Sequence, residues 1–474
     1  MPLRIYNTLT RRKEEFVPLY PGEVRIYSCG VTVYDRCHVG HARSAMVFDV
    51  ICRYLAFRGY RVTFVRNFTD VEDKIIRRAQ QEGVPAAEIS ERYIREFQAD
   101  MEALGVLPVP PGIIYHDPRA TEHVPAMVEL IERLVSKGYA YVVDGDVYFE
   151  IARFPRYGWL SGKNLDELLA GARVEVDERK RDPRDFALWK AAKPGEPSWP
   201  SPWGAGRPGW HIECSVMSTH YLGESLDIHG GGTDLIFPHH ECEIAQTEAD
   251  TGRPFARYWV HNGLVNLGAE KMSKSLGNIL TINEFVKRHE PDAFRLYVLG
   301  THYRSPVEFF EERVRESARA LGRLWGPVKQ ASKYAESRTF GRPEGEPPAE
   351  FASLRERFIA AMDDDFNTPE ALGVLFEFGH ALHRTGARSI QNFVRGAREL
   401  AALAQVLGLL EPKSRIEELP AELSERIASL IGERDEARRR RDWRRADEIR
   451  SVLEQLGLVV KDTPSGTEWE WRGG

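Results

Sequence analysis

In the first part of the chain, apolar residues recur first at the spacing typical of a strand and then at the spacing typical of a helix. This pattern repeats and predicts strands and helices in turn. The first strand is marked by the apolar residues Val24, Ile26, Val31 and Val33. A helical pattern follows over 42–57, a second strand is expected over 60–70, and a second helix over 71–82. Gly59 stands where the first helix would end in a glycine cap. This β-α-β-α order favours a parallel sheet of Rossmann type.

The pattern changes over residues 116–205, which we interpret as an α+β insertion into that α/β domain. A helix is expected over 125–137, and Asp144-Gly145 between two runs of β-branched and aromatic residues predicts the turn of a β-hairpin. Strand and helix patterns resume after the insertion. The later part of the chain is almost wholly helical in pattern.

The composition is that of an ordinary water-soluble protein with several domains. Of 474 residues, 42% are hydrophobic and 29% are charged, and the length exceeds the usual range of one domain. No apolar run approaches the ~20 residues that cross a bilayer, and the N-terminus lacks the apolar core of a secretory signal. We therefore expect a cytoplasmic protein without membrane contact. A formal net charge of −6 argues against indiscriminate binding of nucleic acids.

The cysteines and one helical pair suggest a metal site. Five cysteines are too few for a disulfide framework in this chain, and Cys29 and Cys214 occupy strand-end or loop positions where a doubly wound sheet gathers its site. His239 and Glu243 are four residues apart in a helix that we expect to begin at Pro238, so they share one face. Two thiolates, an imidazole and a carboxylate fit Zn²⁺ better than Mg²⁺ or Ca²⁺. Taken alone, such residues are more often a buried thiol or a polar helix surface.

A second candidate site is the sequence HVGH at 38–41, between a strand and a helix. Gly40 lets a phosphate approach the backbone, the helix start offers free N–H groups, and His38 and His41 can donate to phosphoryl oxygens. Two polar loop histidines would explain the same four residues equally well.

The sequence KMSKS at 271–275 decides between these interpretations. A charged pentapeptide is usually a solvated turn, but its ammonium groups can also meet the charge that develops on phosphates during adenylyl transfer. Paired with HVGH in a Rossmann-type context, the sequence indicates nucleotide chemistry.

HVGH and KMSKS resemble the two signature motifs of class I aminoacyl-tRNA synthetases. Five longer stretches are similar to cysteinyl-tRNA synthetases in particular, and the match runs from about residue 20 to the C-terminus. These stretches are YSCGVTVYD, GWHIECS, DIHGGGTDLIFPHHECEIAQ, KMSKSLGN and MDDDFNTPEAL. Val39 stands where the family usually has Ile, and Cys242 stands where it commonly has Asn, which places an extra thiol beside the candidate metal site.

The resemblance implies an activity. Such an enzyme activates cysteine with ATP, with Mg²⁺ on the nucleotide, and transfers the cysteinyl group from the adenylate to the 3′-terminal adenosine of tRNA(Cys). One bound Zn²⁺ would select the substrate thiolate over the hydroxyl of serine, whose proton is much harder to remove. The resemblance also implies a monomer.

The resemblance assigns residues to each of these tasks. The catalytic positions are His38, His41, Lys271 and Lys274. The ATP-binding positions are Gly40, His229, Gly231, Asp234 and Lys274. The amino-acid pocket would be lined by Thr69 and Trp210. The zinc ligands would be Cys29, Cys214, His239 and Glu243.

Pattern and resemblance together predict six parts. They are the first half of the Rossmann catalytic domain at 1–115, the connective insertion at 116–205, the second half of the catalytic domain at 206–270, a KMSKS loop and stem-contact region at 271–313, a helical bundle at 314–410 and a C-terminal anticodon-recognition module at 411–474. In the bundle, Thr368 is a plausible helix N-cap with Pro369 after it.

The C-terminal part carries a cluster of charge. Residues 433–450 hold eight arginines around Trp443 and six acidic residues. An RNA-binding face and a solvated, salt-bridged helix both fit this pattern; the resemblance of the last residues to the family's C-terminal module favours anticodon recognition.

Two other functions share the leading features. A cysteine ligase that joins activated cysteine to a small sugar amine would have the zinc and both signature motifs but no need of an anticodon module. A non-catalytic tRNA-binding paralogue would not need both phosphate-binding motifs intact.

Overall fold

The structure of the protein is a computed structural model. The described residues are 2–162, 179–267, 270–271, 280–336, 348–386, 389–409, 421–456, 458–463 and 466–471. The chain forms two compact units, Met1–Leu410 and Glu411–Gly474. No described helix combines the length and the apolar character needed to cross a membrane.

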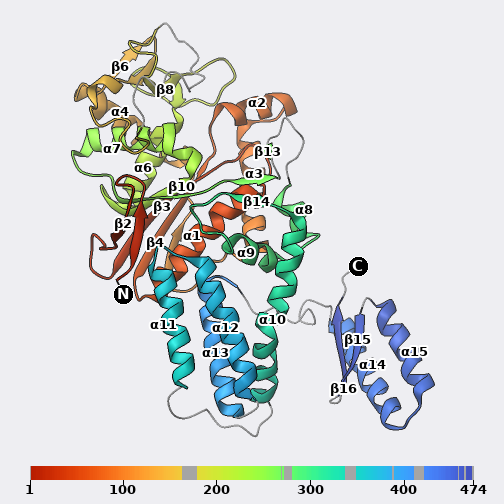
Figure 1. Ribbon diagram of the computed structural model, residues 1–474. Coiled ribbons are helices and arrows are strands. Elements are labelled where there is room, and N and C mark those ends of the chain that lie inside the picture. Colours follow the sequence, from red (N-terminus) through yellow and green to blue (C-terminus); the bar gives the residue numbers. More distant parts are fainter. Residues whose placement is uncertain are drawn as a thin grey trace. The chain divides into compact units, whose positions relative to one another are not determined.

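A five-stranded parallel sheet forms the centre of the first unit and confirms the Rossmann-type prediction (Figure 1). Its strand order is β11-β10-β3-β4-β5, and all neighbours run parallel. The strands are β3 (Glu23–Thr32), β4 (Arg61–Thr69), β5 (Ile113–His116), β10 (Leu226–Gly232) and β11 (Ala256–Asn262). From β3 the chain continues to β4 and β5 on one side of the sheet, and from β10 it continues to β11 on the other side. The strand order therefore reverses between β3 and β10. Such a switch point opens a crevice at the carboxyl ends of the strands.

Helix α1 (Val39–Phe57) joins β3 to β4 and is buried on most of its surface. It begins three residues earlier than the apolar pattern suggested, because the side chains of His38 and His41 cap its first turn. Gly59 follows it with φ of 90°, a conformation that glycine adopts without strain. Two further helices, α2 (Asp73–Glu82) and α3 (Ala86–Ala103), separate β4 from β5.

The insertion is a four-stranded antiparallel sheet of order β6-β7-β8-β9. After α4 (Val124–Ser136), it contains β6 (Ala140–Val143), β7 (Asp146–Phe149), β8 (Phe186–Ala191) and β9 (Gly206–Pro208). Asp144 and Gly145 form the predicted two-residue turn and have φ of 50° and 88°. The helix α6 (Trp210–Leu222) then returns the chain to the central sheet.

The helix that carries Glu243 begins later than predicted. α7 spans Glu241–Thr251, and a short π-helical turn, Ile236–His240, precedes it. Phe237 has non-helical φ and ψ of −138° and 132°, so Pro238 does not start the α-helix. His239 still lies one turn before Glu243 and faces it, with 2.8 Å between its Nε2 and Glu243 Oε1.

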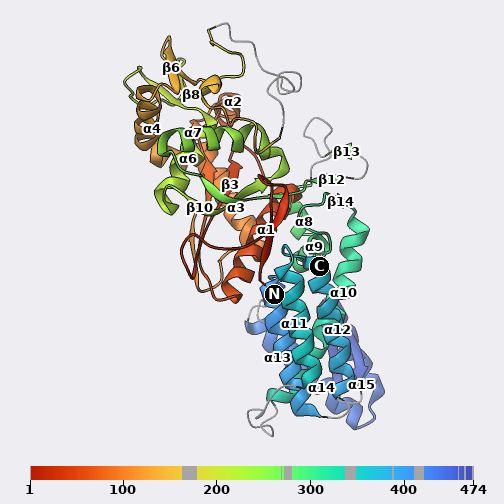
Figure 2. The same ribbon diagram turned by 60° about the vertical axis from the view of Figure 1, so that its left-hand side comes forward.

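The chain leaves the central sheet through a small sheet and then enters a helical bundle. The small sheet has the order β13-β12-β14, with β12 (Val265–Leu267), β13 (Glu270–Lys271) and β14 (Val307–Phe309), and the helices α8 (Ile282–Val286) and α9 (Pro291–Leu299) lie between β13 and β14 in the chain. The bundle comprises α10 (Glu311–Glu336), α11 (Ala349–Asp363), α12 (Thr368–Gly386) and α13 (Ile390–Val406). Figure 2 shows the insertion and the bundle at opposite ends of the first unit, as does Figure 1. An N-terminal hairpin, β1 (Arg4–Asn7) and β2 (Arg12–Glu15), completes this unit.

Asn367 caps α12, rather than Thr368. Its Oδ1 accepts a hydrogen bond from the backbone nitrogen of Glu370 at 3.3 Å. The Thr368 hydroxyl instead donates to the carbonyl oxygen of Leu299 at 2.8 Å, which ties the bundle to α9. An Asn-Thr pair offers two capping side chains, and the tertiary contact decides between them.

The second unit packs two helices against a two-stranded hairpin. Its elements are α14 (Ala421–Arg439), α15 (Trp443–Gln455), β15 (Leu458–Thr463) and β16 (Gly466–Trp471). Several arginines of the basic segment form ion pairs with neighbouring glutamates, including Arg440 with Glu436 and Arg445 with Glu433. Trp443, by contrast, is 57% exposed.

Candidate metal centre and nucleotide corner

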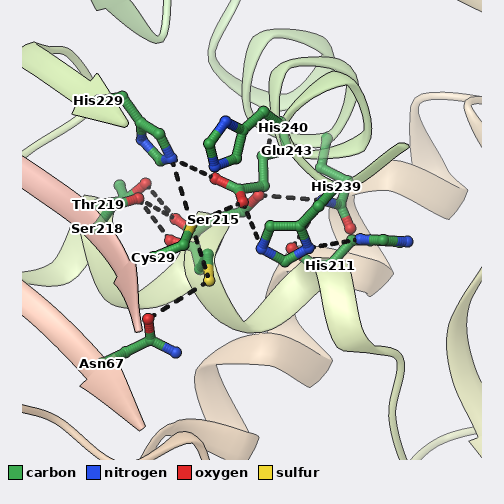
Figure 3. A network of polar contacts seen from close by, with 12 residues as sticks. Cys29, Asn67, His211, Ser215, Ser218, Thr219, His229, His239, His240 and Glu243 are labelled. Atoms are coloured by element: carbon green, nitrogen blue, oxygen red, sulfur yellow. Dashed lines mark hydrogen bonds and ion pairs between the residues drawn. The ribbon is translucent and has the colours of Figure 1, made fainter. Parts of the chain in front are cut away.

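Four side chains meet at the switch point between β3 and β10 (Figure 3). Cys29 comes from β3, Cys214 from α6, His239 from the turn before α7, and Glu243 from α7. All four are buried, and one potential ligand atom from each lies within 4.8 Å of the others. The two sulfurs are 3.7 Å apart, and Cys29 Sγ lies 3.2 Å from Glu243 Oε1. The structure thus brings together the predicted ligands from positions up to 214 residues apart.

Burial and neighbouring groups act in opposite directions on the pKa values of this group. Burial, together with the Cys214 sulfur, raises the pKa of Cys29 well above its usual range. Burial acts the same way on Cys214, but contact with Cys29 and the nearby His239 bring the pKa of Cys214 to about 6. Burial also opposes ionisation of Glu243, yet His229 and His239 hold its pKa well below its usual range. A divalent cation among the four donors would stabilise the second thiolate as well, so this donor set fits a metal that accepts sulfur.

Histidines that the metal prediction omitted surround this group. His229 Nε2 lies 2.8 Å from Glu243 Oε2, and the second possible donor set is Cys29, His229, His240 and Glu243. His211 Nδ1 is 2.8 Å from His239 Nδ1, and so holds the ring of that ligand. The ring of His229 is completely buried here. Its side chain therefore lies with the metal group, a position that its resemblance to an adenosine-binding segment did not indicate.

Asn67 is another residue of the site that sequence reasoning missed. It is 1% exposed, and its Oδ1 accepts from the backbone nitrogen of Gly30 at 2.9 Å and lies 3.7 Å from Cys214 Sγ. A Cβ on Gly30 would lie 1.6 Å from the Asn67 carbonyl oxygen, so only glycine fits after Cys29. The one signal in the sequence was its place two residues before Thr69, on the same face of the strand.

Thr69 and Trp210, the predicted amino-acid pocket residues, both lie next to the metal group. The Thr69 hydroxyl donates to Glu213 Oε2 at 2.9 Å, beside Cys214. The indole of Trp210 stacks on the ring of His239 and is 38% exposed.

The HVGH residues form the start of α1. His38 Nδ1 accepts from the backbone nitrogen of Gly40 at 3.1 Å, and His41 Nδ1 accepts from that of His38 at 3.3 Å. The two rings stack with centroids 3.9 Å apart. Because both Nδ1 atoms accept, a neutral ring carries its proton on Nε2, the atom suited to donate to a phosphoryl oxygen.

The structure brings the flanks of KMSKS close to this corner. At the start of the motif, the backbone of Lys271 pairs with Asn266 across the β12–β13 hairpin. After it, the carbonyl oxygen of Leu280 accepts from the backbone nitrogen of Val39 at 3.2 Å. Residues 272–279, which include Lys274, lie outside the described part of the chain.

The remaining nucleotide-binding candidates lie at the carboxyl end of β10. Gly231 belongs to β10, and Asp234 follows in a short 3₁₀-helix with its side chain exposed. A Cβ on Gly230 would lie 1.9 Å from the Val260 carbonyl oxygen, so this glycine is required by the neighbouring strand.

Comparison with known proteins identifies the family. Residues 15–319 match the tRNA synthetases class I (C) catalytic domain, 357–411 the DALR domain, and 421–472 the cysteinyl-tRNA ligase anticodon binding domain. The chain is 53% identical to a cysteine–tRNA ligase of Geobacter sulfurreducens, over 99% of this chain and 100% of the relative. It is 52% identical to that of Geobacter metallireducens, with the same coverage.

Solved structures agree in fold. A Mycobacterium tuberculosis methionyl-tRNA synthetase in complex with methionyl-adenylate superposes with a TM-score of 0.62 at 16% identity, covering 86% of this chain and 94% of that one. The LeuRS of Agrobacterium radiobacter, in a ternary complex with tRNA, gives a TM-score of 0.62 at 14% identity, covering 84% and 85%. With a class I synthetase fold and these relatives along its whole length, the chain belongs to the cysteine–tRNA ligase family.

Proposed function

We propose that this chain activates cysteine with ATP to cysteinyl-adenylate and transfers the cysteinyl group to the 3′-terminal adenosine of tRNA(Cys). The observation that carries the proposal is the buried group of Cys29, Cys214, His239 and Glu243, in which Cys29 lies on β3, the strand that leads to the capped start of α1. A sulfur-binding centre beside a phosphate-binding helix start is what a cysteine-activating enzyme requires.

The proposed metal is one Zn²⁺ per chain, held by Cys29, Cys214, His239 and Glu243. When bound, it would supply a soft Lewis acid that accepts the substrate as a thiolate. Pocket shape yields only about 1–3 kcal/mol of discrimination between side chains as similar as those of cysteine and serine. A thiol with a pKa of roughly 8.5 ionises far more readily than a hydroxyl. The residues of this chain therefore select cysteine through their choice of metal.

The protein's own side chains would position and neutralise the reacting groups. The cysteine carboxylate attacks the α-phosphorus of ATP, and pyrophosphate leaves with Mg²⁺. His38 and His41 would donate from Nε2 to phosphoryl oxygens, and Lys271 and Lys274 would stabilise the charge that develops on them. In the second step the adenosine hydroxyl attacks the activated carbonyl carbon, and AMP leaves.

Other residues would bind the adenosine and the amino acid. Asp234 would accept from the ribose hydroxyls, and Gly231 would allow close approach of the nucleotide. Any part of His229 in ATP binding would fall to its backbone, because its ring is buried against Glu243. Thr69 and Trp210 would border the bound cysteine.

The second unit would recognise the anticodon of tRNA(Cys), with the enzyme acting as a monomer. The match of 421–472 to an anticodon binding domain supports this assignment. It also disfavours the alternative of a ligase acting on a small sugar amine, which has no use for such a domain.

Aminoacylation of total tRNA with labelled cysteine tests the proposal. We expect cysteine to be attached to tRNA and serine, supplied at the same concentration, to be left unattached. Transfer of cysteine to a small amine in preference to tRNA, or equal charging with serine, would contradict the assignment.

A further inference from the structure

Arg43 is a buried cation that binds a set of backbone carbonyl oxygens. It lies in α1, two residues after the HVGH sequence, and is 0% exposed. Its Nη1 donates to the carbonyl oxygens of Gly263 at 2.7 Å and Leu264 at 2.8 Å. Its Nη2 donates to those of Tyr303 at 3.2 Å and of Ser305. Burial lowers the pKa of Arg43 to about 10, so these carbonyl dipoles must offset a considerable loss of solvation.

The bound carbonyls belong to the two segments that support the β12–β13 hairpin. Gly263 and Leu264 run into β12, and 302–305 run towards β14, which pairs with β12 in parallel. The backbone nitrogen of Gly263 donates to the Tyr303 carbonyl at 2.8 Å. A Cβ on Gly263 would lie 2.5 Å from the Ser305 carbonyl oxygen, so the two segments approach as closely as glycine permits. Arg43 thereby joins the helix that starts with HVGH to the hairpin that leads into KMSKS.

Asp365 binds the same segment from the helical bundle. It is 0% exposed and lies between α11 and α12, with φ of 65°. Its Oδ1 accepts from the Tyr303 hydroxyl and from the Tyr6 backbone nitrogen, both at 2.8 Å. Its Oδ2 accepts from Arg304 Nε at 2.7 Å. A non-glycine residue with a left-handed backbone is held in place by its surroundings, here by this set of bonds.

We propose that Arg43 and Asp365 are positioning residues for adenylation. Between them they fix residues 302–305. Through β14 and β12 they thereby set the position of the β12–β13 hairpin, which leads into KMSKS, relative to the HVGH corner. The proposal rests on the proposed function, since it assigns both residues a part in that reaction. It also gives a role to the MDDDF sequence at 362–366, whose third aspartate is Asp365 and which the metal and nucleotide sites do not use.

Positioning and simple structural support predict different kinetics. Misplacement of the β12–β13 hairpin relative to α1 lowers the rate of phosphoryl chemistry in protein that is fully folded, since catalysis of this kind depends on alignment. Structural support alone would lower the melting temperature and leave kcat unchanged below it. Neither Arg43 nor Asp365 contacts the proposed metal ligands, so metal content and cysteine binding report separately on the integrity of the cysteine site.

The test uses Arg43→Lys and Asp365→Asn in the full-length, metal-loaded protein. Lysine keeps the charge but cannot span four carbonyl oxygens, and asparagine keeps the shape but loses the charge that pairs with Arg304. In cysteine-dependent ATP–pyrophosphate exchange, measured well below each melting temperature, we expect kcat to fall about 10-fold or more for each variant. The KM for cysteine and the metal content should match those of the wild type. The double variant should lose no more than the worse single variant, because both act through 302–305.

Two neighbouring aspartates provide matched controls. Asp364 has a side chain that is 50% exposed and pairs with Lys13 at 2.7 Å, so Asp364→Asn should keep the wild-type kcat. Asp363 is buried and accepts from the Tyr54 hydroxyl at 2.6 Å, so Asp363→Asn should lower the melting temperature without lowering kcat.

Three results would overturn the proposal. They are a kcat of Asp365→Asn within twofold of the wild type, an equal loss of kcat in Asp363→Asn, and losses that multiply in the double variant. Absence of exchange activity in the wild type would instead contradict the proposed function.

Discussion

The indole of Trp210 stacks on the imidazole of His239, with ring centroids 4.2 Å apart and planes 25° from parallel. One of the two rings offers a candidate metal ligand, and the other is partly exposed at the start of α6. The indole therefore covers one face of the His239 ring and is itself partly exposed to solvent.

This stacking predicts a defect in cysteine binding for Trp210→Ala. Loss of the indole would remove an apolar wall from the proposed pocket, so the KM for cysteine should rise about tenfold in Trp210→Ala. In Trp210→Phe, which can still stack on His239, the KM for cysteine should rise less. Steady-state exchange kinetics and metal analysis check both variants. Loss of the metal in Trp210→Ala would show that the ring secures His239 and does not line the pocket.

The metal assignment predicts a sharp difference between adjacent residues of α7. Glu243→Gln should lose the metal and lower the melting temperature, because a charged donor is removed from a buried group. Cys242→Ala is the matched control: the thiol is buried beside the Tyr157 hydroxyl at 3.3 Å and belongs to neither donor set, so its metal content should stay at one per chain. Elemental analysis of the two purified variants decides the matter, and equal metal content would contradict the assignment.

Lys274→Ala should lower kcat for adenylation by about 10²-fold or more, because the charge contact that we propose for Lys274 in the transition state would be lost. The KM for cysteine should change little, since that substrate is held elsewhere. Pyrophosphate exchange measures both constants. An unaltered exchange rate would remove Lys274 from the catalytic residues.

Asp100 predicts a pH-dependent gain of stability on substitution. It is 8% exposed on α3, and burial together with Glu96 raises its pKa to about 6. An acid whose folded pKa lies above its unfolded value binds its proton more tightly when folded, so the charged form destabilises the protein above pH 6. Asp100→Asn should therefore raise the melting temperature by roughly 1–3 °C at pH 8, and the gain should shrink as the pH falls from about 6 towards 4. The exposed Glu102→Gln on the same helix is the control and should show no such trend; a constant gain from pH 8 to pH 4 would refute the explanation.

Removal of the second unit should affect one step only. Truncation after Leu410 leaves every proposed metal and nucleotide residue in place, so cysteine-dependent exchange should persist while tRNA charging falls sharply. Binding of tRNA to the full chain should weaken steeply with salt as phosphate contacts are screened. Charging by the truncated protein at the full rate would contradict anticodon recognition by 411–474.

Local features of this fold could be predicted from the sequence, and long-range contacts could not. The parallel sheet, the insertion and the Asp144-Gly145 turn follow from periodicity and turn chemistry, which act between near neighbours. The metal donors were predicted from the resemblance to the family, because no spacing rule connects Cys29 to Cys214. Arg43 and Asp365 gave no signal, since only the folded chain brings their partners near. These partners are backbone carbonyls for Arg43 and chiefly the side chains of Tyr303 and Arg304 for Asp365.

The errors have the same physical origin. Pro238 was expected to start a helix, but the π-helical turn delays α7 to Glu241. Thr368 was expected to cap α12, but its hydroxyl is engaged by Leu299. In each case a tertiary contact or a local distortion outweighed the intrinsic preference of the residue.

The order of strands in the central sheet determines when β3 can pair with β10 during synthesis. β3 and β10 are neighbours in space, yet the ribosome makes the whole insertion between them. Until residues 226–232 leave the exit tunnel, one edge of β3 has unpaired backbone groups, and an open edge of this kind can pair with other chains. Half of the catalytic domain is therefore vulnerable to aggregation during that stage. Cys29 can meet its full set of candidate donors only after the stage ends, because His239 and Glu243 follow β10 in the chain.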